Sequence, residues 1–346
     1  MKLSDTHKIE ERCKIINHNA YYNATKIAFG HKRVDIKELY HYCSLETFYN
    51  IIESNCFWLS HPKFMNDLSE HKYSIGTTKK FLHEYNNKID ENDASKELLN
   101  RIESNILDYE GKFEGFDEGK YEQLEFFTCF SSDGDSLPMW SMYRGKDVGI
   151  AMGLDFTDKN YFIDIPKHSD EDITLEKRSP FYHINFCIFS DITYEEGKIE
   201  KAINIFLEQV RCDYKTIKTE FNNDIQYVNE YLSNRATSTL VNMATNLKNN
   251  NFSYEKETRL IVPFYADEDI KFRVRDKFIV PYIEFPLVNN KQKFNKPIIP
   301  IKSITISPNA EEPELVKASI WAFLNHKGYK IDKKEIKQSS IPFKPR

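Results

Sequence analysis

The sequence predicts an α+β fold, built on a mixed or antiparallel sheet that is interrupted by two helical insertions and followed by a C-terminal helix. A near-continuous apolar run at residues 126–131 is typical of a buried strand. Apolar residues alternate with small ones from 148 to 156, which is the period of a strand. Because strand patterns do not alternate regularly with helical patterns, a doubly wound parallel sheet is disfavoured.

The first elements lie between residues 38 and 60. The aromatic segment 38–42 predicts a short strand, and 57–60 predicts the start of a second one. Between them, apolar side chains recur at helical spacing after Ser44, whose hydroxyl is suited to cap a helix N-terminus. A polar loop that contains Asn66 and Asp67 then follows the second strand.

Helical patterns dominate two longer segments, 71–120 and 196–250, which we interpret as insertions into the core. A last helix is expected from about 311 to 326, because Asn309 and Glu312 have the spacing of a capping box. The remaining strand patterns lie at 184–194, 254–264, 272–285 and 299–306.

These patterns divide the chain into three parts. They are a polar leader at 1–30, a single α+β core domain at 31–310 that contains both insertions, and a C-terminal helix with a basic tail at 311–346. With 346 residues, of which 40% are hydrophobic, the chain is long enough to bury a substantial core.

Composition limits the expected partners. The net charge of −5 provides no global basic field for nucleic acid or an anionic membrane. No segment approaches the roughly 18 apolar residues that span a bilayer, and the charged N-terminus lacks the apolar run of a signal peptide. We therefore expect a cytoplasmic protein with no membrane partner. The six cysteines include no Cys-x-x-Cys pair, which predicts reduced thiols and speaks against a zinc site.

Three polar clusters, far apart in the sequence, are expected to meet in one cleft. The clusters are Tyr40, His41 and Tyr42 with the loop residues Asn66 and Asp67; Trp140 with Tyr143; and Glu257 with Arg259. A neutral imidazole both donates and accepts hydrogen bonds, which suits ribose hydroxyls. The alternative for His41 is a half-buried structural residue. Asn and Asp side chains also cap turns without any ligand.

The second and third clusters each allow two interpretations. Trp140 and Tyr143 share a face if their segment is helical, and they either stack on a nicotinamide or nucleobase or fill the core. Period two places Glu255, Glu257 and Arg259 on one face of a strand. A carboxylate there can stabilise an oxocarbenium-like centre or act as a base, whereas the alternative is an ion-pair ladder between strands.

Other chemistries lack a defining motif. The sequence contains no phosphate-binding P-loop, no Gly-x-Gly-x-x-Gly after a strand and no nucleophile elbow. No metal-ligand set is predicted. A metal-dependent nuclease built on scattered residues nevertheless stays open as an alternative; its candidates are Asp191, Glu255 and Glu257 with Lys256.

The ordered set of motifs resembles the bacterial family called domain of unknown function 2971. Two positions depart from that family's pattern, because Leu68 stands where Pro is frequent and Tyr254 stands where Trp is frequent. The resemblance implies a toxin-like effector in bacterial stress or phage defence, with a neighbouring antitoxin or defence partner. The motifs that carry it lie at 39–44, 65–70, 129–131, 139–143, 193–194 and 254–261, with Asp135 and Gly149 between them.

The segment around Tyr40, His41 and Tyr42 is also similar, more loosely, to the first motif of NAD-dependent ADP-ribosyltransferases, including toxins that modify DNA. That resemblance implies a split sheet with NAD in its cleft. His41 would hold the NAD ribose, Trp140 or Tyr143 would pack on the nicotinamide, and Glu257 would be the catalytic residue that supports the reacting ribose. The middle motif of those enzymes has no recognisable match here.

The two resemblances together imply an NAD-consuming enzyme, either an ADP-ribosyltransferase or a glycohydrolase. Its acceptor would be nucleic acid, a protein side chain or water. Tyr42, Asn66, Asp67 and Arg259 would then belong to the NAD site beside His41. A non-catalytic module that binds a nucleotide or a partner is the main alternative.

Overall fold

The structure, a computed structural model, describes residues 3–29, 38–65, 68–115, 126–143, 148–156, 188–262, 270–275, 277–285 and 299–342. It confirms a mixed α+β fold with a C-terminal helix. The chain divides into two compact units, which we call the helical unit and the sheet unit. The helical unit comprises Met1–Arg33, Asp67–Lys120 and Ile192–Phe252, and the sheet unit comprises Val34–Asn66, Tyr121–Asp191 and Ser253–Arg346.

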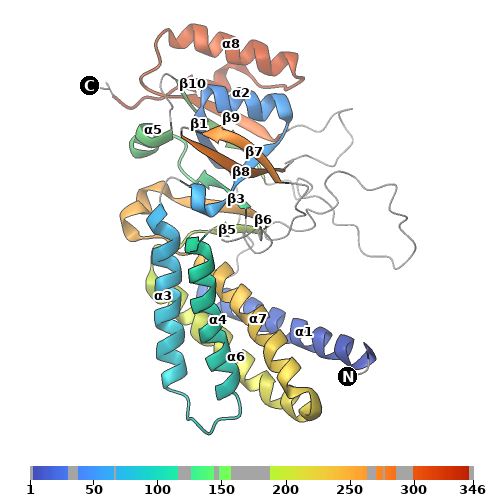
Figure 1. Cartoon of the computed structure of the whole chain (residues 1–346). Helices are drawn as coiled ribbons and strands as arrows, with labels where there is room; N and C mark the ends of the chain where they lie inside the picture. Colours follow the sequence, from blue (N-terminus) through green and yellow to red (C-terminus); the bar gives the residue numbers. More distant parts are fainter. Residues whose placement is uncertain are drawn as a thin grey trace. The chain divides into compact units, whose positions relative to one another are not determined.

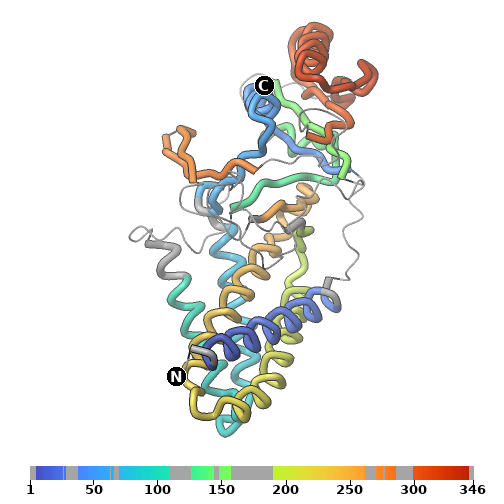
Figure 2. The backbone as a smooth tube through the Cα atoms, turned by 90° about the vertical axis from the view of Figure 1, so that its right-hand side faces the viewer, coloured from blue at the N-terminus to red at the C-terminus, as the bar shows by residue number. Residues whose placement is uncertain are grey.

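The helical unit is built from α1 (Leu3–Phe29), α3 (Leu68–Asn87), α4 (Lys96–Gly115), α6 (Glu196–Glu220), η5 (Asn222–Asp224) and α7 (Ile225–Ala244). Buried residues of α6 recur every three or four positions, for example at Ile199, Phe206 and Val210, so one side of this helix is apolar. Figure 2 shows α1 lying across the helices of this unit, where it packs against α6 and α7 in a shared apolar core. Inside that core, the Tyr214 hydroxyl donates to Asn229 Oδ1 at 2.6 Å.

The helical unit combines segments that the sequence patterns had assigned to different parts of the chain. α1 occupies Leu3–Phe29 of the segment expected as a polar leader at 1–30, and its side chains Ile9 and Cys13 are fully buried. Helices are present in both predicted segments, as α3 and α4 within 71–120 and as α6 and α7 within 196–250, and they share their core with α1. The physical reason is that each of these helices has one apolar face, which it cannot bury alone.

The strands that the structure describes belong to the sheet unit. Their path runs β10-β9-β4-β1-β3-β2-β8-β7, with β6 paired to β3 and β5 paired to β6. The pairing of β10 with β9 is parallel and the other pairings are antiparallel, so the sheet is mixed, as predicted. The strands are β1 (Leu39–Ser44), β2 (Phe57–Ser60), β3 (Phe126–Ser131), β4 (Gly149–Leu154), β5 (Ile188–Asp191), β6 (Glu257–Val262), β7 (Ile270–Arg275), β8 (Phe278–Phe285), β9 (Ile301–Ile306) and β10 (Ile336–Gln338).

Helices cover both faces of this sheet; they are α2 (Leu45–Ser54), α5 (Leu137–Tyr143) and α8 (Pro313–His326). α2 and α8 lie over one face (Figure 1), where Phe48 of α2 is buried in the same apolar cluster as Met152 of β4. On the other face, Trp140 of α5 packs with Tyr42 and Ala151. The alternation of large and small residues in β4 therefore reflects a thick core on one face and a short helix on the other.

The helix ends agree with the sequence in part. Ser44 caps α2, because its Oγ accepts a hydrogen bond from a backbone N–H in the first turn at 3.1 Å. The capping box expected between Asn309 and Glu312 is wrong, since Glu312 is itself the N-cap of α8 and makes no side-chain cap bond. Pro313 begins this helix, and the fixed φ and missing N–H of proline suit that first position.

The sheet forks at β3. This strand pairs with β6 over six residues, from Phe126 to Ser131. Its other edge meets β1 at one pairing, Tyr40 with Ser131, and meets β2 at one pairing, Ser60 with Phe127. β1 and β2 therefore hold opposite ends of one edge, and between these two pairings the edge has no strand partner among the described residues.

Two general properties of the described chain complete the fold. Among the residues that the structure describes, no helix is both long and apolar enough to cross a membrane. The cysteines that the structure describes are free thiols, and Cys187 lies outside the described residues.

Gly134, in the turn between β3 and α5, lies close to the ring of Tyr40. A β-carbon at this position would lie 2.3 Å from Cε1 of the Tyr40 ring, so Gly134→Ala must displace that ring. We expect the substitution to lower the free energy of unfolding by about 1–3 kcal/mol, as overpacking does elsewhere. Urea denaturation measures the change.

Gly76→Ala is the matched control. Gly76 lies inside α3, where an added β-carbon meets nothing within 4 Å. Because alanine has the higher helix propensity, we expect this variant to gain up to about 1 kcal/mol. Unchanged stability of Gly134→Ala would contradict the close contact with Tyr40.

Candidate functional site

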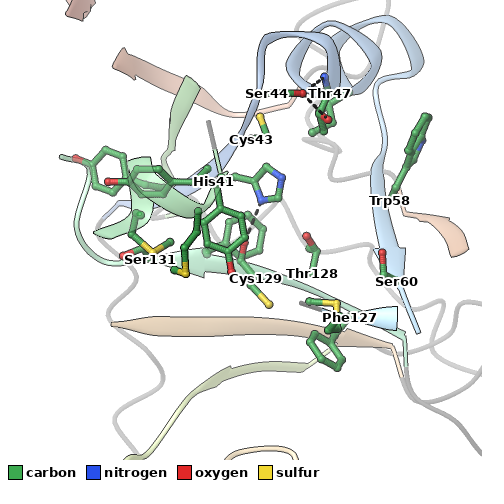
Figure 3. A pocket seen from close by; sticks show the side chains of 18 of the residues that line it. His41, Cys43, Ser44, Thr47, Trp58, Ser60, Phe127, Thr128, Cys129 and Ser131 are labelled. Atoms are coloured by element: carbon green, nitrogen blue, oxygen red, sulfur yellow. Dashed lines mark hydrogen bonds between the residues drawn. The ribbon is translucent and has the colours of Figure 1, made fainter. Parts of the chain in front are cut away.

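The open edge of β3 borders a cavity of about 570 Å³ within the sheet unit. Five consecutive residues of β3, Phe127 to Ser131, line it. Since successive side chains of a strand point to opposite faces, a consecutive lining shows that the backbone edge itself faces the cavity. β1 and α2 form one wall and β2 forms another, as Figure 3 shows. A volume of this size is typical of sites for small molecules.

His41 of β1 fills part of the gap between β1 and β3. Its Nδ1 donates to the carbonyl oxygen of Cys129 at 3.0 Å (Figure 3), where a continuous ladder would have placed a backbone partner. The rings of Phe57 and Phe130 contact the imidazole edge to face. Burial lowers the pKa of His41 to about 4, against the smaller opposing effect of the hydrogen bond to Cys129. The ring is therefore neutral near pH 7, with Nε2 as an acceptor.

Tyr42 and Trp140 position the loop between β3 and α5. The Tyr42 hydroxyl donates to the carbonyl oxygen of Asp133 at 2.8 Å and accepts from the backbone N–H of Ser136 at 3.0 Å. Trp140 is fully buried, and its Nε1 donates to Asp135 Oδ1 at 2.8 Å. The two rings meet at 4.8 Å between centroids. Trp140 is thus placed in the core and does not belong to the cavity lining formed by the described residues.

Tyr143 is the member of the predicted aromatic pair that borders the cavity. It stands at the C-terminal end of α5, three residues after the buried Trp140. Met139 and Met142 from the same helix also line the cavity. The buried indole fixes the helix, and the end of that helix presents Tyr143.

Glu257 and Arg259 form a buried ion pair at the start of β6. Arg259 Nε lies 2.7 Å from Glu257 Oε1, and Arg259 Nη2 lies 3.3 Å from Oε2. The guanidinium also lies over the ring of Phe127, at 4.5 Å from its centroid. Glu257 lines the cavity, so the arginine holds this carboxylate in one orientation at the cavity wall.

Glu255 does not share a regular strand with Glu257, which corrects the expected alternation. Glu255 ends the 3₁₀ helix η6 (Asn250–Glu255), and Lys256 has a φ of 46° before β6 begins. The ion pair of Lys256 Nζ with Asp133 Oδ2, at 2.9 Å, accompanies this left-handed residue. Glu255 and Glu257 both line the cavity in spite of the break.

Strand register places His41 and Glu257 on opposite faces of the sheet. Tyr40 is paired with Ser131, and Ser131 is paired with Glu257, so these three residues share one face. His41 follows Tyr40 in β1 and points to the other face. Both line the same cavity because the fork opens the sheet between them.

The structure adds polar residues that the sequence patterns did not predict as part of the site. Ser44 and Thr47 at the start of α2, with their hydroxyls 3.0 Å apart, lie close to His41 in Figure 3. Arg273 and Arg275 of β7 line the cavity too. The signal that could have found them is the alternation of Lys271, Arg273 and Arg275 with apolar residues, which places three cations on one strand face. Asn66 and Asp67 lie outside the described residues.

No family model matches the chain, and no curated protein or solved structure matches it. Within the described part of the chain, no group of three or more His, Cys, Asp or Glu side chains is arranged to hold a metal ion.

The lowered pKa of His41 gives a prediction about pH. The unfolded state takes up a proton near the ordinary value of 6.5, whereas the folded state does so only near 4. Stability is therefore lost as pH falls from 6.5 to 4, by up to about 3 kcal/mol from this residue. Urea denaturation at pH 7 and pH 4.5 measures the loss.

His41→Gln is the control, because it removes the titrating group. We expect the loss of stability on acidification to be smaller in this variant than in the parent protein. Heteronuclear NMR of the imidazole should also show the Nδ1–H tautomer at pH 7. An imidazole that titrates between pH 6 and 7 would contradict its burial.

Proposed function

We propose that the protein binds NAD in this cavity and cleaves the bond between nicotinamide and ribose, passing ADP-ribose to an acceptor or to water. The observation that carries the proposal is that His41, Tyr143 and Glu257, from three distant parts of the sequence, line one cavity of about 570 Å³. Each supplies a group that this chemistry uses.

His41 and Tyr143 would bind and orient the substrate. Because Nδ1 of His41 donates to Cys129, its Nε2 has a lone pair that can accept a hydrogen bond from a ribose hydroxyl. The ring of Tyr143 offers a flat surface on which a nicotinamide can stack. The fully buried Trp140 supports the helix that carries Tyr143, and we assign it no contact with the ligand.

Glu257 would stabilise the charge that develops on the ribose. When the bond from C1′ to the nicotinamide nitrogen breaks, its electron pair leaves with nicotinamide and positive charge develops over C1′ and the ring oxygen. A fixed carboxylate stabilises that charge electrostatically. Water or another nucleophile then bonds to C1′ and releases a proton. Arg259 holds the carboxylate in place before the reaction begins.

One observation favours a second candidate, a module that binds a nucleotide without turnover. The carboxylate of Glu257 is already engaged by Arg259 at 2.7 Å, as in a purely structural ion pair. Binding and turnover must therefore be measured separately. A toxin-like role in bacterial stress or phage defence rests on the family resemblance, and arrested growth of a bacterial host on expression of the protein would support it.

The test uses purified protein with NAD labelled in its adenylate part, in the presence of cell lysate, DNA or RNA. We expect nicotinamide release, together with label on an acceptor or free ADP-ribose. Glu257→Gln keeps the shape and loses the charge, so it should lower the rate by roughly 100-fold or more while NAD binding persists. Calorimetry measures the binding.

Glu284→Gln is the matched control. Glu284 of β8 pairs with Lys271 at 2.6 Å and is not among the described residues that line the cavity, so turnover should stay unchanged. NAD binding without any nicotinamide release by the parent protein would leave the binding module as the function. The absence of both would contradict the two candidates.

A further inference from the structure

β7 presents a row of cations on one face. Its pairing with β8 sets Lys271 opposite Tyr282 and Arg273 opposite Val280, with Arg275 two residues further along. Since alternate residues of a strand share a face, Lys271, Arg273 and Arg275 point to the same side. Alternate positions are about 7 Å apart in a strand, so the guanidiniums of Arg273 and Arg275 are neighbours.

The three cations differ in how their charge is balanced. Lys271 Nζ pairs with Glu284 Oε2 at 2.6 Å. Arg273 Nη2 donates to the hydroxyl of Ser60 at 3.0 Å, and Arg275 donates to the carbonyl oxygen of Phe64, which are both neutral acceptors. Neither arginine has a carboxylate partner in the described part of the chain. Two arginines that have no carboxylate partner among the described residues therefore line the cavity.

Aromatic rings hold Arg273 in place. Its guanidinium carbon lies 4.9 Å from the ring centroid of Trp58 and 5.4 Å from that of Tyr282. Arg273 Nε and Trp58 Nε1 are buried N–H donors that find no hydrogen-bond acceptor in the part of the chain that the structure describes. Buried donors of this kind are costly unless an acceptor reaches them, and a bound anion would supply one.

The position of these donors relative to Glu257 suggests an extended ligand. Arg273 donates a hydrogen bond to Ser60, and Ser60 pairs with Phe127 at one end of β3. Glu257 pairs with Ser131 at the other end of β3. Phe127 and Ser131 are four positions apart along the strand, which is roughly 13 Å. The cavity thus has a cationic end and a carboxylate end, both along the open edge of β3.

We propose that Arg273 and Arg275 form a subsite for the diphosphate of a nucleotide, with Trp58 Nε1 and the Ser60 hydroxyl as further donors. The planar guanidinium donates two parallel hydrogen bonds to phosphate oxygens, and two neighbouring guanidiniums suit two linked phosphates better than a single carboxylate. The subsite rests on the proposed function only for the identity of the nucleotide. Its affinity for diphosphate follows from the arginines alone.

The experiment titrates the full-length protein with inorganic pyrophosphate and with ADP in a calorimeter. We expect both to bind, and we expect Arg273→Met and Arg275→Met each to weaken both affinities by about 10- to 100-fold, as loss of a charge-assisted hydrogen bond does. Lys271→Met is the matched control. It removes a cation from the same strand face, but one already paired with Glu284, so it should change either affinity less than threefold.

Arg273→Met also removes packing against Trp58, so its folding must be checked. Arg273→Lys keeps the charge and the stem but loses the planar pair of donors, and it should still weaken pyrophosphate binding several-fold. Near-ultraviolet circular dichroism of the tryptophans shows whether the packing around Trp58 is intact. Arg275→Met leaves the contact between Arg273 and Trp58 in place, so it tests independently whether the arginines bind pyrophosphate.

The outcomes separate this subsite from the proposed function. Pyrophosphate binding that depends on Arg273 and Arg275, without nicotinamide release, would support the subsite and contradict the proposed enzymatic activity. NAD turnover by a protein that binds neither pyrophosphate nor ADP would overturn the subsite and still support the proposed enzymatic activity. Equal weakening by Lys271→Met, or no weakening by the arginine variants, would overturn the subsite as well.

Discussion

The site depends on how the two edges of β3 are used. A strand has two edges for backbone hydrogen bonds, and β6 occupies one of them over six residues. β1 and β2 share the other edge, and each keeps only one pairing there. Because buried N–H and C=O groups need partners, the gap between these pairings cannot simply close on apolar side chains. His41 supplies one such partner to Cys129, and the rest of the edge faces the cavity.

The same fork distributes polarity along the cavity. Glu257 lines the cavity from β6, which pairs with β3. Arg273 lines it from β7, which is joined to β3 through β8 and β2. His41 also lines the cavity, and it is neutral because burial lowers its pKa. A ligand with a diphosphate at one end and a developing positive charge at the other matches this order of groups.

The residues that the sequence predicted for the site have different positions in the structure. His41, Tyr143 and Glu257 border the cavity, whereas Trp140 is sealed in the core and Arg259 orients Glu257 from within a buried pair. Sequence spacing showed that Trp140 and Tyr143 share a helix. It did not show which one faces the core, because that depends on where Tyr42 and Asp135 lie in the fold.

Local elements could be predicted from the amino-acid sequence, because hydrophobic period and capping residues act within a few positions: the apolar run of β3, the alternation of β4 and the Ser44 cap are examples. Three features became visible only in the folded chain: α1 belongs to a helical core, the sheet forks at β3, and Arg273 and Arg275 border the cavity. These features depend on contacts between segments far apart in the chain. Strand pairing and charge compensation there are set by which edge and which face each segment finds, and no local pattern encodes that choice.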